Sequence, residues 1–321
     1  MKLAFLERNS IGLDIDVSAI KALADEYVEY ANTVGAEETT AHVGDADILV
    51  LNKAKINEET IGNCPNVKYI TLLATGFDNI DLEYCKSRGI KVSNVTNYCC
   101  PAVAQHTILL ALMLSEKIAY YDQYVKSGAY GAQDRFSHFD RSFYEMEGKT
   151  WGIVGMGNIG RKVAQMATGM GCKVIFYSAS GKSTCTDYPM VDLDTLLAES
   201  DILSLHCPLS DRTQNLINMD ALKKMKKTAI LVNVARGPVV NSQDLYTALE
   251  EEIIAGAGLD VLEKEPIAAD DPLGRIKDST KLIITPHMSW TSIESRQRLL
   301  HENVTNIESF LAGGNKNVLN L

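Results

Sequence analysis

The 321-residue sequence lacks several features that would mark particular classes of protein. No stretch approaches the ~20 consecutive apolar residues that a membrane-spanning helix needs, and the apolar segment at the N-terminus is too short for a signal peptide. The longest basic cluster, residues 223–227, is typical of a solvated helix end in a chain whose net charge is −10. We therefore predict neither a membrane nor a nucleic-acid partner.

The seven cysteines include no Cys-x-x-Cys pair, and their number is odd. Neither a disulfide framework nor a metal site is expected from this pattern, and a reducing, cytoplasmic setting fits it. We interpret the adjacent Cys99 and Cys100 as small buried hydrophobic residues and assign them no role.

Strand-like and helix-like segments alternate along the chain, which predicts parallel sheets built from βα units. The first series of strands is expected at residues 1–6, 47–51, 69–73 and 91–95. The second is expected near residues 150–154, 173–177, 202–205, 229–234, 255–261 and 282–285. A long helix beginning at Pro101 separates the two series, and another is expected over residues 291–312. The fold class we predict is α/β, with two Rossmann-like, doubly wound parallel-sheet domains and a cleft between them.

A glycine-rich turn follows the expected strand at residues 150–154 and opens a helical pattern. In Gly155-Met156-Gly157-Asn158-Ile159-Gly160, the first glycine permits a tight turn, the second lets backbone approach a pyrophosphate, and the third lets the helix pack on the sheet. The pattern predicts a dinucleotide site, the alternative being an ordinary βα turn of another α/β protein.

Three polar side chains follow neighbouring strands of the second series, at the edge where ligands of such sheets bind. They are Arg236, Glu265 and His287. A guanidinium can pair with a substrate carboxylate and polarise a carbonyl, an imidazole can act as general acid or base, and a carboxylate beside it favours its protonated form. Taken singly, Arg236 could be a surface charge, Glu265 a solvated loop residue and His287 a core histidine. Together, beside a dinucleotide turn, they predict hydride transfer to a 2-oxo acid.

These residues belong to motifs through which the chain resembles the D-isomer-specific 2-hydroxyacid dehydrogenases over nearly its whole length. The motifs are Ala74-Thr75-Gly76 with Asn79-Ile80-Asp81, Val103-Ala104-Gln105-His106-Thr107, the glycine turn, His206-Cys207-Pro208-Leu209, Asn233-Val234-Ala235-Arg236-Gly237, Gly258-Leu259-Asp260-Val261, Glu265-Pro266 and Thr285-Pro286-His287.

The resemblance implies a discontinuous substrate-binding domain, residues 1–100 plus 290–321, a dinucleotide-binding domain, residues 101–289, and a homodimer. It also implies that Thr75 and Gly76 hold the substrate carboxylate, that Arg236 and His287 contact the substrate as well, and that Asp260 bonds the nicotinamide carboxamide. Further cofactor contacts implied by the likeness are at Thr107, Cys207, Pro208, Thr213, Val234 and Ala235, with Arg236 and His287 lining the same site.

The pattern around Thr285–Trp290 and Arg296–Leu300 looks most like the branch of glycerate dehydrogenases and hydroxypyruvate reductases. This likeness implies hydroxypyruvate or glyoxylate as the 2-oxo acid, reduced to D-glycerate or glycolate, and the reverse reaction. Trp290 either walls the substrate pocket or packs beneath a helix. The alternatives are a reductase of branched or aromatic 2-oxo acids and, from another class, a non-catalytic corepressor-like protein that responds to a dinucleotide. The lack of long polar extensions favours an enzyme.

The sequence departs from the NAD pattern at the end of the strand over residues 173–177. An NAD enzyme usually places Asp or Glu there, on the ribose hydroxyls, whereas this chain has Ser178, followed by Ser180 and Lys182. The next acid, Asp187, is expected to be out of reach. We therefore predict use of NADP or NAD, with NADP favoured. The alternative is a serine-rich surface loop that contacts nothing.

Overall fold

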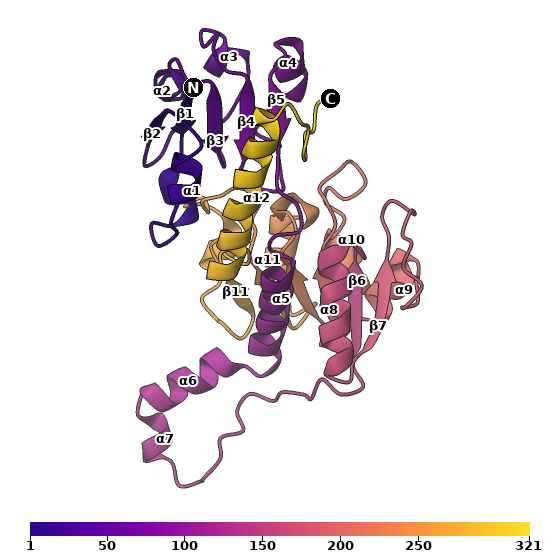
Figure 1. The fold of residues 1–321 in the computed structure, drawn as a ribbon. Helices are drawn as coiled ribbons and strands as arrows, with labels where there is room; N and C mark the ends of the chain where they lie inside the picture. Colours follow the sequence, from indigo (N-terminus) through magenta and orange to yellow (C-terminus); the bar gives the residue numbers. More distant parts are fainter. The chain divides into compact units, whose positions relative to one another are not determined.

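The computed structural model describes residues 1–321, and the chain divides into two compact units. Unit 1 comprises Met1–Cys99 and Thr291–Leu321, and unit 2 comprises Cys100–Trp290. Each contains one all-parallel sheet with helices packed against it (Figure 1). The predicted α/β class with two parallel-sheet domains is confirmed.

The sheet of unit 1 has five strands in the order β2-β1-β3-β4-β5. Its strands are β1 (Lys2–Phe5), β2 (Glu26–Glu29), β3 (Ile48–Leu51), β4 (Tyr69–Leu72) and β5 (Lys91–Ser93). The helices are η1 (Arg8–Ile11), α1 (Ser18–Lys21), α2 (Ala36–Val43), α3 (Glu58–Ile61), α4 (Leu82–Ser87) and α12 (Ile293–Leu311). The C-terminal helix α12 packs on β4, where the Thr71 hydroxyl donates to Oδ1 of the buried Asn303 at 2.6 Å.

The sheet of unit 2 has six strands in the order β11-β10-β9-β8-β6-β7. Its strands are β6 (Thr150–Val154), β7 (Lys173–Tyr177), β8 (Ile202–Leu205), β9 (Ile230–Asn233), β10 (Gly256–Leu259) and β11 (Leu282–Ile284). Every residue of β8, β9 and β10 is buried. This explains why these strands are apolar except for Ser204 and Asn233 and show no alternation of polar and apolar residues.

The helices of unit 2 cover both faces of this sheet, except for a segment that extends away from it. They are α5 (Cys100–Ser115), α6 (Ile118–Lys126), α7 (Ala129–Ala132), α8 (Asn158–Gly169), α9 (Leu193–Glu199), α10 (Met219–Lys224), η2 (Gly237–Val239), α11 (Ser242–Glu250) and η3 (Pro272–Arg275). Helix α5 packs against α8, β9 and β10. Helices α6 and α7 project from the rest of unit 2 (Figure 1).

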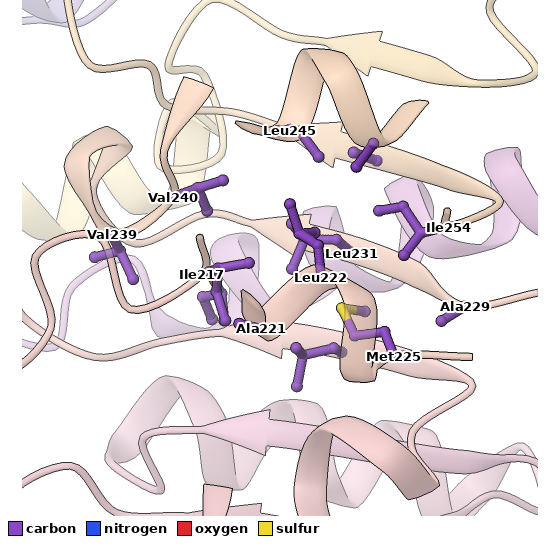
Figure 2. Close-up of a cluster of buried hydrophobic side chains, with 14 of the residues drawn as sticks. Ile217, Ala221, Leu222, Met225, Ala229, Leu231, Val239, Val240, Leu245 and Ile254 are labelled. Carbon is purple, nitrogen blue, oxygen red and sulfur yellow. The ribbon is translucent and has the colours of Figure 1, made fainter. Parts of the chain in front are cut away.

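A hydrophobic core in unit 2 fixes the strands that carry the polar side chains described below. Leu231 of β9 packs with Leu222 of α10 and Leu245 of α11, and all three are fully buried (Figure 2). Fully burying one such side chain contributes roughly 1.5–3 kcal/mol. The ends of β9 and β10 are therefore anchored to a well-packed layer.

No single helix is long and apolar enough to cross a bilayer. Helices α5 and α6 meet that criterion only when taken together, and they bend by 61° at their junction. Half of the α5 side chains are buried within the protein.

Candidate functional site

The glycine turn between β6 and α8 has the geometry of a phosphate cradle. Gly155 has φ +94°, and a Cβ there would lie 2.9 Å from the backbone of His206. A Cβ at Gly160 would lie 2.2 Å from the carbonyl oxygen of Gly155, so both positions require glycine. Nothing lies within 4 Å of a Cβ built on Gly157, which leaves open space at the N-terminus of α8. The backbone amides at the start of a helix form a site that suits a pyrophosphate.

A pocket of about 310 Å³ lies beside this turn. Of the predicted cofactor residues, it is lined by Gly155, Gly157, Ser178, Cys207, Pro208 and Thr213. Two cationic residues line it as well, Lys182 and Arg212. Arg212 was not predicted, although Cys207, Pro208 and Thr213 of the same loop after β8 were, because groups that recognise the ribose were sought only after β7. The residues present fit a dinucleotide.

The remaining predicted cofactor residues lie near the turn or in the core of unit 2. Asn158, Ile159 and Gly160 form the first turn of α8. Thr107 is fully buried in α5, and its hydroxyl donates to the Val103 carbonyl at 2.8 Å. The others, Val234 and Ala235, are each 8% exposed beyond β9. Their contacts with a cofactor stay predictions.

The three candidate catalytic residues follow strands whose ends are level. In the register of the sheet, Leu259 of β10 pairs with Asn233 of β9 and with Ile284 of β11. Arg236, Glu265 and His287 come three, six and three residues after those positions. All three therefore lie at one edge of the sheet of unit 2.

His287 and Glu265 form a hydrogen-bonded pair. The distance from His287 Nδ1 to Glu265 Oε2 is 2.6 Å, and the side chains are 31% and 35% exposed. The other carboxylate oxygen accepts from the Leu262 amide at 2.9 Å, which fixes the direction of Glu265. His287 has φ 50°, a left-handed conformation. This conformation is uncommon for residues other than glycine, and such residues cluster at functional sites. The carboxylate orients the imidazole so that Nε2 is left for a ligand.

Asp260 holds the segment that carries His287. Its buried carboxylate accepts from the Thr285 hydroxyl at 2.6 Å and from the amides of Met288 and Ser289 at 2.8 and 2.9 Å. The Asp260 carbonyl accepts from the His287 amide at 2.9 Å. Both carboxylate oxygens are thus used within the chain, and the predicted bond to a carboxamide stays a prediction.

His106 of α5 extends this network, and sequence analysis did not single it out beyond its motif. Its Nε2 lies 2.9 Å from the Thr285 hydroxyl oxygen. Because that hydroxyl donates to Asp260, its oxygen accepts from His106, which assigns the ring proton to Nε2. Burial lowers the pKa of His106, partly offset by the Asp260 carboxylate. A neutral His106 therefore supports the segment at His287.

Arg236 is half-buried and stands on a turn that packs against the segment holding Glu265. Its Nη1 donates to the Ala235 carbonyl at 2.8 Å. The Asn233 side chain spans the turn, since its Nδ2 donates to the Arg236 carbonyl at 2.9 Å. A Cβ on Gly237 would lie 1.9 Å from the Leu262 carbonyl group, so the two segments are in direct backbone contact.

The predicted substrate residues are divided between the units. Thr75 and Gly76 lie in unit 1, in the turn after β4, where the Thr75 hydroxyl donates to the Val95 carbonyl at 2.8 Å. The Asn94 side chain donates to the Thr75 carbonyl at 2.7 Å. Trp290 is half-buried and is the last residue of unit 2. Their roles toward a substrate stay predictions.

Comparison with known proteins places this site in a family. The family model for the D-isomer specific 2-hydroxyacid dehydrogenase, NAD binding domain, matches residues 108–289. The hydroxypyruvate reductase of Blautia hydrogenotrophica is 37% identical over 96% of this chain and 95% of its own length. The glycerate dehydrogenase of Methylorubrum extorquens is 37% identical over 99% and 98%. The D-lactate dehydrogenase of Aquifex aeolicus, solved with NAD and lactic acid, superposes with a TM-score of 0.84 at 28% identity and covers 100% and 99% of the two chains.

Proposed function

Because the chain belongs to the D-isomer-specific 2-hydroxyacid dehydrogenases, we propose that it reduces hydroxypyruvate and glyoxylate to D-glycerate and glycolate. A nicotinamide dinucleotide, NAD or NADP, is the redox partner of this family. The observation that carries the proposal is the pairing of His287 with Glu265 at 2.6 Å, at the same sheet edge as Arg236 and in the unit that contains the glycine turn.

In the proposed reaction, each of the three side chains has a separate task. Arg236 pairs with the substrate carboxylate and polarises the carbonyl oxygen, which fixes the orientation of the 2-oxo acid. Bound NAD(P)H supplies the hydride. His287 donates a proton from Nε2 to the carbonyl oxygen, and in the reverse direction it accepts that proton. Glu265 keeps the imidazole oriented and stabilises its positive charge.

The choice of hydroxypyruvate and glyoxylate rests on relatives and is tested directly. The two relatives above are named hydroxypyruvate reductase and glycerate dehydrogenase. Purified protein is mixed with NADPH or NADH and a panel of small, branched and aromatic 2-oxo acids while the loss of nicotinamide absorbance is followed. We expect the highest kcat/KM with hydroxypyruvate or glyoxylate. A higher value with a branched or aromatic acid contradicts the substrate assignment, and no reaction with any acid contradicts the function.

We propose that NADPH is favoured over NADH. Ser178 lines the pocket where an NAD enzyme of this fold usually has an acid. No carboxylate is among the lining residues, so no negative charge repels a 2′-phosphate. The nearest acid considered from the sequence, Asp187, lies 3.7 Å from Arg161 in an ion pair.

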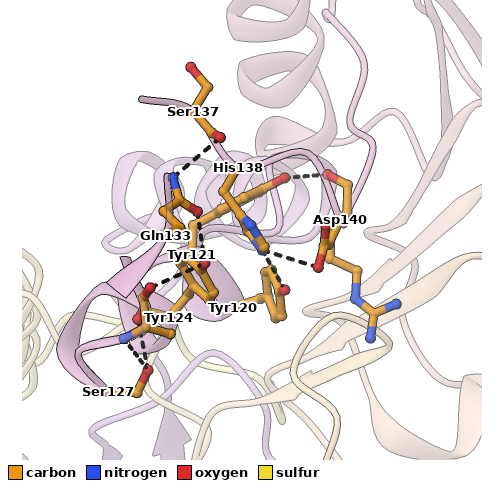
Figure 3. A network of polar contacts seen from close by, with 10 residues as sticks. Tyr120, Tyr121, Tyr124, Ser127, Gln133, Ser137, His138 and Asp140 are labelled. Atoms are coloured by element: carbon orange, nitrogen blue, oxygen red, sulfur yellow. Dashed lines mark hydrogen bonds and ion pairs between the residues drawn. The ribbon is translucent and has the colours of Figure 1, made fainter. Parts of the chain in front are cut away.

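We propose a homodimer that uses the projecting segment of residues 117–147. A stacked pair, Tyr124 and His138 with centroids 3.7 Å apart, folds this segment on itself, and the Tyr120 hydroxyl lies 2.8 Å from His138 Nε2 (Figure 3). Phe136 and Phe139 are nevertheless 90% and 70% exposed. Such apolar exposure is typical of an interface. Light scattering coupled to size exclusion should give twice the chain mass, and a monomer mass contradicts the proposal.

We expect a reducing, cytoplasmic setting. None of the seven cysteines forms a disulfide. Burial raises the pKa of Cys85 and of Cys207 to about 11, which keeps both thiols protonated and unreactive. Thiol labelling of the denatured protein without reductant should find all seven, and fewer would show a disulfide.

A further inference from the structure

The pocket at the glycine turn is positively charged, although the whole chain carries a net charge of −10. Its cationic residues are Lys182 and Arg212, and no lining residue is acidic. Burial lowers the pKa of His206, a third lining residue, to about 3, so its imidazole is neutral. The positive charge therefore comes from Lys182 and Arg212 alone.

The strand order explains how two distant loops contribute to one pocket. In the sheet of unit 2, β6 lies between β8 and β7. The turn after β6 thus has the loop of Lys182, which follows β7, on one side and the loop of Arg212, which follows β8, on the other. Gly157 of the turn, with open space at its Cβ position, lines the same pocket. A ligand on the turn is therefore reached from both sides.

Neither cationic head group is used by the fold. Lys182 and Arg212 are exposed, and neither side chain forms a hydrogen bond or ion pair within the chain. Neighbouring cations differ, since Arg161 pairs with Asp187 at 3.7 Å and Lys162 donates to Gln165 at 3.0 Å. Unpaired cations beside a phosphate-binding turn are suited to a further phosphate group.

We propose that Arg212, together with Lys182, binds the 2′-phosphate of NADP and so determines cofactor specificity. The hydroxyls of Ser178, Ser180 and Ser183 line the same pocket and can donate to the remaining phosphate oxygens. A dianionic phosphate monoester matches this set of donors, whereas an unphosphorylated ribose is better matched by a carboxylate. The inference rests on the proposed use of NADPH and assigns it to a residue outside the loop that follows β7.

The alternative within the same chemistry is that Arg212 binds the pyrophosphate, which NAD and NADP share. Calorimetric titration distinguishes the two binding modes. The ligands are NADPH, NADH and 2′,5′-ADP. The proteins are the wild type, Arg212→Gln and the control Lys162→Gln. Lys162 lies on α8 outside the pocket lining, so its variant removes the same charge without the contact.

We expect Arg212→Gln to weaken NADPH and 2′,5′-ADP binding by tenfold or more and NADH binding by less than twofold. Lys162→Gln should leave all three within twofold. Equal weakening of NADPH and NADH, or unchanged NADPH binding, overturns the inference. If Arg212→Gln does not fold, Lys182→Gln provides the same comparison, with the same outcomes for and against.

These binding measurements need no substrate, so they stand apart from the proposed reaction. Tighter binding of NADH than NADPH by the wild type contradicts the inference about Arg212. Failure of the wild type to reduce any 2-oxo acid contradicts the proposed function and leaves the binding comparison intact.

Discussion

Replacing Glu265 with glutamine tests the pairing with His287 by its effect on the pH dependence of the reaction. The substitution keeps the shape of the side chain and removes its charge, 2.6 Å from the imidazole. Opposite unit charges at that distance attract by about 1.6 kcal/mol in water and about 6 kcal/mol at an effective dielectric constant of about 20. Because the two side chains are 31% and 35% exposed, solvent screening favours the lower figure.

The direction in which the pH profile shifts depends on which protonation state of His287 each reaction needs. Reduction needs the protonated imidazole, which Glu265 stabilises. In Glu265→Gln the alkaline limb of kcat/KM for reduction should therefore move to lower pH, and the acidic limb for oxidation should move to lower pH as well. The control is Glu263→Gln, since Glu263 is in the same loop and accepts from the Ser242 amide at 2.9 Å. Superimposable profiles for wild type and Glu265→Gln would refute the pairing.

Four other changes test the rest of the site. His287→Ala should lower kcat by about 10²–10⁴. The dinucleotide Kd, measured by fluorescence titration, should stay within a few-fold of the wild-type value, and a much higher Kd would mean that His287 acts mainly in cofactor binding. Arg236→Lys should impair both kcat and KM in steady-state assays because an ammonium cannot reproduce the planar fork; near-normal kcat/KM means the assignment is wrong. Gly237→Ala should lower Tm and activity together, since its Cβ would lie 1.9 Å from the Leu262 carbonyl group; unchanged values would show that the turn adjusts. Ser178→Asp should shift the ratio of kcat/KM values toward NADH by about tenfold, or 1.4 kcal/mol, and a wild-type preference for NADH above tenfold would contradict the premise.

The strands that could be predicted were those composed mainly of apolar residues. All six strands of unit 2 were expected. Five of them, all but β11, consist mostly of buried residues and are therefore rich in apolar side chains. The missed strand is β2, Glu26–Glu29, whose residues are exposed or half-buried. It lies at the edge of its sheet and pairs with β1 alone, so it needs no apolar run.

The candidate site could be predicted where the chain order and the strand ends coincide. Glu265 and His287, 22 residues apart, follow adjacent parallel strands, which is why their proximity could be inferred. Arg212 was not inferred in that way. Its loop was predicted to contact the cofactor through Cys207, Pro208 and Thr213, but that the order β8-β6-β7 places it opposite the loop of Lys182 follows only from the sheet. The His106 network was missed for a similar reason, since helix α5 precedes the sheet that it packs against.

The stereochemistry of the product tests the central claim most directly. Wild-type protein is incubated with hydroxypyruvate and NADPH, and the glycerate formed is resolved by chiral chromatography. The account predicts D-glycerate in an amount equal to the NADPH consumed, formed about 10²–10⁴ times more slowly with His287→Ala. L-glycerate, or no glycerate at all, would contradict it.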